Sequence, residues 1–220
     1  MAVRASTHPR SGRGRPAGGS ELKRAAIEQA AMDLFVRDGF DRTSVDAIAE
    51  QAGVSKRTIY NHYGDKENLF LSVVQHGFDA LMTGVIEIMD KYLTDIPDDA
   101  VEPDIIGFSC ELALMAARSQ ERASLLRVMM TEAPRFPALQ AAQMRPRGIT
   151  AAIAGKLARL SARGLLDVTD PEDAANHLFA LTMGQMNNRS FYGTRRMTDE
   201  EITKMATSGA RVFLRAYRPR

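Results

Sequence analysis

The chain has 220 residues, of which 45% are hydrophobic and 25% charged, values typical of a globular protein long enough to bury its own core. It contains no run of about 18 apolar residues that would predict a membrane span, and no apolar segment follows the N-terminal arginines to form a secretory signal. The single cysteine, Cys110, excludes an intrachain disulfide and a zinc site built from several cysteines. We therefore expect a cytoplasmic protein without a metal or cofactor.

The net charge of +2 is unevenly distributed along the chain. Residues 1–20 carry four arginines and no acid, whereas residues 21–66 hold seven Lys or Arg against eight Asp or Glu, and the remainder holds 18 against 19. The positive excess therefore lies in the N-terminal tail. Any attraction of the rest of the chain to phosphate must come from individually placed side chains.

Residues 1–19 contain hardly any apolar bulk, so we predict a disordered basic tail. The segment Gly12-Arg13-Gly14-Arg15-Pro16 is similar to the core of an AT-hook, in which Arg13 and Arg15 would enter the narrow minor groove of A·T-rich DNA. The alternative is a solvated tail that attracts DNA without specificity. The sequence leaves both interpretations open.

The next segment predicts a helix followed by a helix-turn-helix. Ser20 is a suitable N-cap for a helix running to about Asp38, which Gly39 would close. Residues 43–63 then predict two short helices, with Thr43 as the first N-cap and Asp46 completing a capping box. A turn that contains glycine joins these helices, and this arrangement places the second helix in the major groove of DNA.

The second short helix has a cap and a polar outer face. Ser55 is its predicted N-cap, and Ile59 and Tyr63 are predicted to point inward. After Tyr63, Asp65 should cap a further helix that begins at Lys66. The outward residues of the second helix are Lys56, Arg57, Thr58, Tyr60, Asn61 and His62.

A set of motifs spans roughly residues 21–71: Leu34-Phe35, Gly39-Phe40, Thr43-Ser44-Val45, Ile48-Ala49, Ala52-Gly53-Val54-Ser55, Thr58-Ile59-Tyr60, His62-Tyr63 and Lys66-Glu67-Asn68-Leu69-Phe70. The segment resembles the N-terminal domain of TetR-type (tetracycline-repressor-like) transcriptional regulators. The resemblance implies an all-α homodimer with a three-helix DNA-binding head at residues 20–66, which binds a double-stranded DNA operator. It also implies a helical domain at residues 67–220 that dimerises and binds a small effector.

The resemblance also implies roles in DNA binding. Thr43, Tyr60 and Lys66 look like phosphate contacts, and His62 would assist them. Ser55 starts the face that meets base edges, which comprises Lys56, Arg57, Thr58 and Asn61. By base chemistry, lysine and arginine suit guanine, asparagine suits adenine, and a threonine methyl suits thymine. Two alternatives remain open: Tyr60 could be a packing aromatic, and Lys66 a solvated lysine.

Helical periodicity continues to the C-terminus. It predicts a helix to Leu93, a loop at residues 94–99, helices around residues 105–115 and 125–130, and a break at residues 132–137. A helix from Leu139 to Leu160 is predicted to kink at Pro146 or to begin near it, and to end at Gly164. The last two helices should start at the caps Asp170 and Thr198.

The segments 132–139, 164–168 and 170–175 resemble a C-terminal domain type of this family, in which the last two long helices form a four-helix dimer bundle. The alternative is that the apolar stripes only cover the core of one protomer. We place the predicted dimer seam on Ile149, Ile153, Leu157, Leu160, Leu178, Leu181 and Met186.

Flexible thioethers suit an adaptable apolar pocket, so the twelve methionines suggest an apolar or amphipathic effector. Ordinary core filling is the alternative for each of them. The predicted ligand-contacting residues are Met82, Met89, Phe108, Met115, Met129 and Met183.

The sequence thus predicts a dimeric, sequence-specific transcriptional regulator that is not an enzyme, specifically a repressor released from a pseudo-palindromic operator by an effector. An architectural DNA-binding protein without an effector is one alternative. A helical enzyme is another, but no phosphate-binding glycine loop follows a strand. The four histidines form no recognisable catalytic arrangement with Cys110 or with carboxylates.

Overall fold

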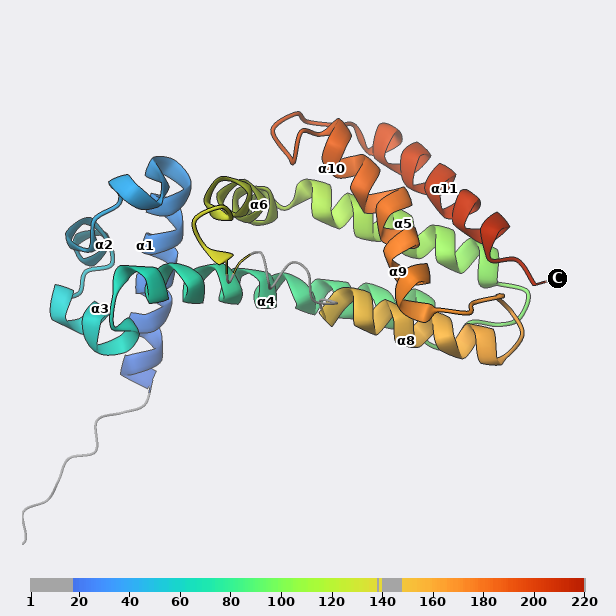
Figure 1. Ribbon diagram of the computed structural model, residues 1–220, viewed down its shortest axis with the longest axis horizontal. Coiled ribbons are helices and arrows are strands. Elements are labelled where there is room, and N and C mark those ends of the chain that lie inside the picture. Colours follow the sequence, from blue (N-terminus) through green and yellow to red (C-terminus); the bar gives the residue numbers. More distant parts are fainter. Residues whose placement is uncertain (1–17, 138, 140–147, 220) are drawn as a thin grey trace, which may run out of the picture.

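The structure is a computed structural model that describes residues 18–137, 139 and 148–219. All regular elements within these residues are helical, which confirms the all-α prediction (Figure 1). Most of the predicted tail, with Arg13 and Arg15, and the predicted kink at Pro146 lie outside the described residues. The helices are α1 (Gly18–Arg42), α2 (Val45–Gln51), α3 (Lys56–Tyr63), α4 (Lys66–Leu93), α5 (Val101–Arg118), α6 (Gln120–Glu132), α8 (Gly148–Ala162), α9 (Pro171–Phe179), α10 (Gln185–Arg189) and α11 (Asp199–Ala216), with a π-helical segment η1 (Ala180–Gly184) between α9 and α10.

Helices α1, α2 and α3 form a head at one end of the molecule (Figure 1). Helix α1 begins two residues before the predicted cap Ser20, and its regular geometry is interrupted at Gly39, which has φ 78° and ψ 169°. Glycine tolerates this left-handed φ because it has no Cβ. The prediction that Gly39 ends the regular part of the helix therefore agrees with the structure.

The cap of α2 differs from the prediction by one residue. Ser44 is the N-cap, and its hydroxyl accepts a hydrogen bond from the backbone N–H of Ala47 at 3.1 Å. Thr43 instead turns inward: its hydroxyl donates to the carbonyl of Gly39 at 2.7 Å and is within 3.2 Å of the carbonyl of Leu34. The predicted Thr43 cap and its capping box with Asp46 are therefore wrong, because Thr43 satisfies the end of α1 instead.

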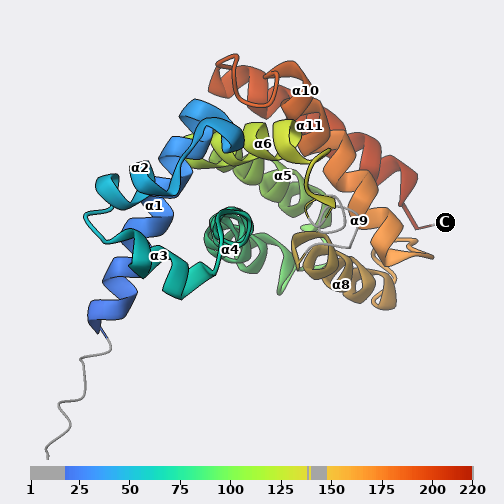
Figure 2. The ribbon, with the colours of Figure 1, turned by 60° about the vertical axis from the view of Figure 1, so that its left-hand side comes forward.

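Helix α4 belongs to both halves of the molecule. It starts beside the head, with Asp65 as the predicted N-cap, and continues into the C-terminal body (Figures 1 and 2). Its first turns bury Leu69, Phe70 and Val73 in the head core, and its last turns bury Ile88 and Leu93 in the second core. The head core therefore extends past residue 66, where the sequence divides the two predicted domains.

Helix α4 is also long and apolar enough, by length and composition, to cross a membrane, the only such helix among the described residues. A core helix of a soluble protein meets the same criterion. The apolar positions at both ends of α4 are occupied by core packing in this structure. The finding therefore gives weak support for a span.

A second connection joins the head to the body after α6. Phe136 packs against Phe40 and Phe70, with ring centroids 4.9 Å apart in both pairs. The Glu132 carboxylate accepts a hydrogen bond from the backbone N–H of Phe40 at 3.2 Å, and Arg135 forms an ion pair with Asp41. The predicted break at residues 132–137 is therefore also a contact with the head.

Helices α5, α8, α9 and α11 surround the second core, together with η1 and α10. The predicted caps Asp170 and Thr198 are both present, and Thr198 forms a complete capping box with Glu201. Helix α11 packs closely on η1, since a Cβ at Gly209 would lie 2.1 Å from the carbonyl oxygen of Leu181. Only glycine fits there without a backbone shift.

The predicted dimer seam is incompatible with this packing. Five of its seven residues are almost fully buried within a single protomer, so they cannot meet a second copy in this conformation. Ile149 and Leu181 are partly buried. The stripes belong to the protomer core, which is the alternative interpretation of the pattern. The five buried residues are Ile153, Leu157, Leu160, Leu178 and Met186.

A polar cluster fixes the end of α3 against α1 and α4. Tyr63 donates a hydrogen bond to the Glu28 carboxylate at 3.0 Å, and Arg24 and His76 lie 3.0 and 2.8 Å from the same oxygen. Burial of the ring, followed by the nearby charge of Glu28, raises the pKa of Tyr63 to about 12. The folded state therefore favours the neutral phenol.

We expect Tyr63 to stabilise the fold fully below its unfolded pKa of about 10 and to lose this contribution as pH rises to about 12. The full shift corresponds to about 3 kcal/mol. Because the ring is partly exposed and solvent-screened, we expect about 1 kcal/mol. Urea unfolding of the wild type and of Tyr63→Phe across this range measures the loss. Parallel pH profiles for the two proteins would contradict the assignment.

Candidate nucleic-acid interface and ligand clefts

The turn between α2 and α3 has the geometry of a helix-turn-helix. Gly53 adopts φ 64°, and the backbone N–H of Val54 donates to the carbonyl of Ala49 at 3.0 Å. Ser55 caps α3 as predicted, accepting a hydrogen bond from the N–H of Thr58 at 3.1 Å. Ile59 is buried in the head core and anchors the inner face of α3. The opposite face is therefore held toward solvent.

Five of the predicted DNA-contacting side chains lie on this outer face. Tyr60 is 43% exposed, which argues against the alternative of a buried packing aromatic. The hydroxyls of Ser55 and Thr58 lie 2.8 Å apart and bond to each other, so both are occupied at the start of the helix. The exposed residues among them that lie within α3 are Lys56, Arg57, Tyr60, Asn61 and His62.

Lys56 is paired in this structure. Its ammonium donates to the Asp46 carboxylate at 2.9 Å, and this hydrogen bond is the main cause of the raised pKa of Lys56. Both side chains are well exposed, so the pair is weak. Asp46 therefore competes with a base or phosphate for the Lys56 ammonium.

Two predicted phosphate contacts face the interior. Thr43 is only 2% exposed, and its hydroxyl is already bonded, so its side chain is not available to DNA. The ammonium of Lys66 donates to the carbonyls of Phe40 and Thr43 at 2.9 and 3.0 Å and lies 4.2 Å from the Phe40 ring centroid. Lys66 is thus neither a solvated lysine nor a free cation, because it caps the end of α1.

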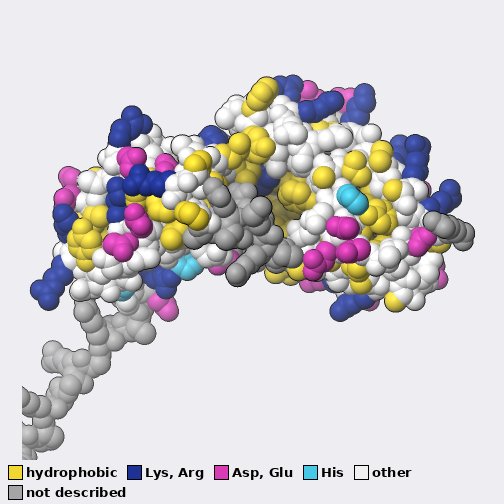
Figure 3. All heavy atoms as spheres, in the orientation of Figure 1, with side chains coloured by type: hydrophobic (Ala, Val, Ile, Leu, Met, Phe, Trp, Pro, Cys, Tyr) yellow, Lys and Arg dark blue, Asp and Glu magenta, His cyan; other side chains and the backbone are white. Residues whose placement is uncertain are grey.

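Charges on the head alternate in sign. On the face seen in Figure 3, both basic and acidic side chains cover the head, in agreement with its near-neutral sequence. The interface therefore depends on where α3 places its side chains. Among the residues that the structure describes, no group of three or more His, Cys, Asp or Glu could hold a metal ion.

The predicted ligand residues do not share one cavity. Met89, Phe108 and Met183 are buried in the second core, and Met129 is buried in the head core. Met82 is partly buried. Their burial agrees with core packing, the alternative interpretation of the methionine pattern, and their contact with a ligand stays a prediction.

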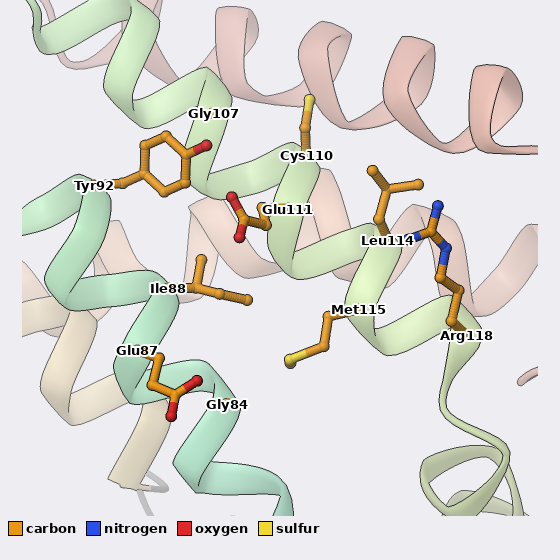
Figure 4. A pocket seen from close by; sticks show the side chains of 10 residues that line it. All are labelled: Gly84, Glu87, Ile88, Tyr92, Gly107, Cys110, Glu111, Leu114, Met115 and Arg118. Atoms are coloured by element: carbon orange, nitrogen blue, oxygen red, sulfur yellow. The ribbon is translucent and has the colours of Figure 1, made fainter.

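Met115 lines a cleft that lies between α4 and α5 and has a volume of about 640 Å³. Figure 4 shows Ile88 of α4 and Met115 of α5 projecting into the space between the helices. Glu111 projects toward Tyr92 in the same view and accepts a hydrogen bond from Lys91 at 2.6 Å. The cleft is thus apolar in part and acidic at its edge.

Comparisons with known proteins agree with this geometry. A family model of bacterial regulatory proteins of the tetR family matches residues 27–73, and a model of the AefR-like transcriptional repressor C-terminal domain matches residues 110–219. A TetR-family transcriptional regulator from Mesorhizobium loti is 30% identical, with a TM-score of 0.79 over 90% of this chain and 98% of that chain. The flavonoid-responsive regulator FrrA is 28% identical, with a TM-score of 0.72 over 91% and 99%.

Curated relatives match part of the chain. The HTH-type transcriptional activator FasR of Mycolicibacterium smegmatis is 38% identical over 93 residues, which are 39% of this chain and 42% of FasR. An HTH-type transcriptional regulator of Staphylococcus aureus is 35% identical over 69 residues, 31% of this chain and 37% of its own length. The chain thus matches only about two fifths of these relatives' length. One family model covers most of the head, and the other covers half of the chain, within the C-terminal body. Together with the likeness to nearly the whole Mesorhizobium structure, they show that the chain belongs to the TetR family of transcriptional regulators.

Proposed function

We propose that the chain is a cytoplasmic homodimer that binds a pseudo-palindromic DNA operator and represses transcription until a small organic effector releases it. The observation that carries the proposal is the outer face of α3, which presents Arg57, Tyr60 and Asn61 to solvent while Ile59 anchors the helix. These side-chain types suit guanine, phosphate and adenine.

Release by an effector is supported by the two connections between body and head. Helix α4 and the segment after α6 both contact the head core, so a ligand that moves either one would tilt α3. In a dimer, two α3 helices must lie about 34–36 Å apart to enter successive major grooves. A ligand that prefers another spacing would lower DNA affinity by differential binding.

Repression is supported by the family model of an AefR-like repressor domain, which matches half of the chain. FasR, in contrast, is named as an activator, so the sign of regulation needs a direct test. FrrA is named as flavonoid-responsive, which supports a small organic effector for a protein of this shape.

The dimer face that we propose replaces the predicted seam. Figure 3 shows hydrophobic side chains over α9 and α11 on one face of the body. Phe179 from α9 and Leu181 from η1 are only partly buried, and Val212 of α11 is 47% exposed. A second copy that covers this face would pair these two helices with their symmetry mates.

The primary test is selection of bound DNA from a random pool, followed by a reporter assay with the selected operator. An operator with two inverted half-sites, and increased reporter expression when the gene is deleted, would support the proposal. Binding without sequence preference would favour an architectural DNA-binding protein instead.

On the selected operator, we expect Arg57→Ala to weaken binding by about 1–3 kcal/mol and to relax preference at one position of each half-site. Tyr60→Phe should weaken binding on all sequences and reduce the salt slope by about one unit per lost phosphate contact. Fluorescence anisotropy at several salt concentrations measures both effects. Arg159→Ala, at an exposed position of α8, is the control. Wild-type affinity in both head variants would refute the interface.

Asp46→Asn should tighten DNA binding by about two- to fivefold, because it releases Lys56 from its weak surface pair. The same substitution in a Lys56→Met background should give a smaller gain, and this double-mutant cycle separates the pair from the general loss of negative charge. Glu102→Gln, on α5, is the matched control for net charge. An equal gain in both backgrounds would show that Lys56 does not contact DNA.

Val212→Glu should place a charge in the proposed dimer face of each copy and raise the dimer dissociation constant by about 100-fold or more. Sedimentation equilibrium measures the change. Ile86→Glu, at a 46% exposed position on α4, is the matched control and should leave the dimer intact. Dissociation by Ile86→Glu and not by Val212→Glu would move the interface to α4.

A further inference from the structure

A second cleft, of about 650 Å³, lies where α5 ends and α6 begins, opposite the segment between α10 and α11. That segment comes close to α6: a Cβ at Gly193 would lie 2.6 Å from the Cβ of Ala123. Figures 1 and 2 both show the connection between α10 and α11 on the side of the body where α6 lies. The volume is within the usual range of small-molecule sites.

The lining of this cleft is strongly basic. It includes five arginines and no acidic residue. Arg118 forms an ion pair with Asp199, and Arg195 forms one with Glu201. The remaining three, Arg122, Arg127 and Arg196, have no ion-pair partner in the part of the chain that the structure describes.

Arg122 is the most unusual of these residues. Its guanidinium is partly buried and donates to the neutral side-chain oxygen of Asn187 at 2.8 Å. Burial without a neighbouring carboxylate lowers the pKa of Arg122 to about 10. A desolvated charge without a counterion destabilises a protein unless a bound group of opposite charge or further hydrogen bonds compensate it. A guanidinium also offers the planar, paired donors that fit a carboxylate or phosphate.

The opposite wall is held in a costly conformation. Phe191 and Tyr192 adopt φ 46° and 56°, left-handed values that are unfavourable for residues with a side chain, and Gly193 follows with φ 88°. The turn is closed by hydrogen bonds from the N–H of Tyr192 to the carbonyl of Asn187 at 2.7 Å and from the N–H of Arg195 to that of Ser190 at 2.8 Å. Strain of this kind concentrates at ligand sites.

We propose that this cleft binds an organic anion whose carboxylate or phosphate is held by Arg122 and whose small apolar body packs on Ala116, Ala123 and Met197. Arg127 and Arg196 add positive charge around the same site. The inference rests on the proposed function only where it identifies this anion as the effector. Binding of the anion itself does not depend on DNA.

The test is isothermal calorimetry on the full-length protein at constant ionic strength, with hexanoate, hexyl phosphate and neutral hexan-1-ol as probes. We expect at least one anion to bind about tenfold or more tightly than hexan-1-ol. Hexanoate and hexyl phosphate then distinguish a carboxylate from a phosphate ligand. The proposal is overturned if neither anion binds, or if hexan-1-ol binds as tightly as the anions.

Arg122→Met should weaken anion binding about tenfold or more and leave hexan-1-ol unaffected, whereas the control Arg159→Met should change neither. Because Arg122 lacks a counterion, its removal should not lower the melting temperature of the ligand-free protein. If Arg122→Met does not fold, Arg122→Lys provides the test: it keeps the charge, loses the paired donors and should bind the anion more weakly. Wild-type anion affinity in a folded Arg122 variant would overturn the proposal.

The selected operator separates the two proposals. Arg122→Met should bind it like the wild type but should no longer be released by the bound anion. Arg122-dependent anion binding in a protein that selects no DNA would refute the proposed function and leave this site intact. DNA selection without anion binding would refute the anion site and leave the proposed function intact.

Discussion

Three phenylalanines from distant parts of the chain join the head to the rest of the molecule. Phe40 follows the interruption of α1, Phe70 lies in the first turns of α4, and Phe136 follows α6, with ring centroids 4.9 to 5.2 Å apart. The Lys66 ammonium lies on the Phe40 ring and bonds the carbonyls at the end of α1. Aromatic pairs of this geometry contribute about 0.5–1.5 kcal/mol each beyond their burial. The orientation of α3 toward DNA depends on this cluster, because α3 is anchored to the same core through Ile59.

Because of this arrangement, recognition of DNA depends more on the position of α3 than on the net charge of the head. The head has nearly equal numbers of acidic and basic residues, and Lys56 and Lys66 are both bonded within it. Non-specific attraction of the head to phosphate should therefore be small, so that binding by the dimer that we propose should depend on the correct spacing of its two heads. A head of this kind responds to small displacements, since it has little sequence-independent affinity of its own to hold it on DNA. The half-buried Arg122, far from α3, offers a place where an anion could impose such a displacement.

Local rules predicted the helices well and the contacts between them poorly. Ser55, Asp65, Asp170 and Thr198 were identifiable as caps because capping depends on residues within one turn. The predicted seam failed because one apolar spacing serves a protomer core and an interface equally well. The contact of Phe136 with the head has no local signal. The sequence does contain a local signal for Arg122. No acidic residue lies three or four positions before or after it, so no ion pair within the helix can neutralise it.

Phe136 and Leu139 are part of the head core. The packing of the head therefore depends on residues about 100 positions later in the chain than Phe40. An N-terminal fragment that ends with α4 would expose Phe40 and Phe70 where Phe136 normally covers them. During synthesis the head can only complete its core after α6 has left the ribosome. For the same reason, when heads are exchanged between family members, the transferred head should be accompanied by the residues that correspond to Val128, Met129, Phe136 and Leu139. Otherwise the transferred head will pack against side chains that do not fit it.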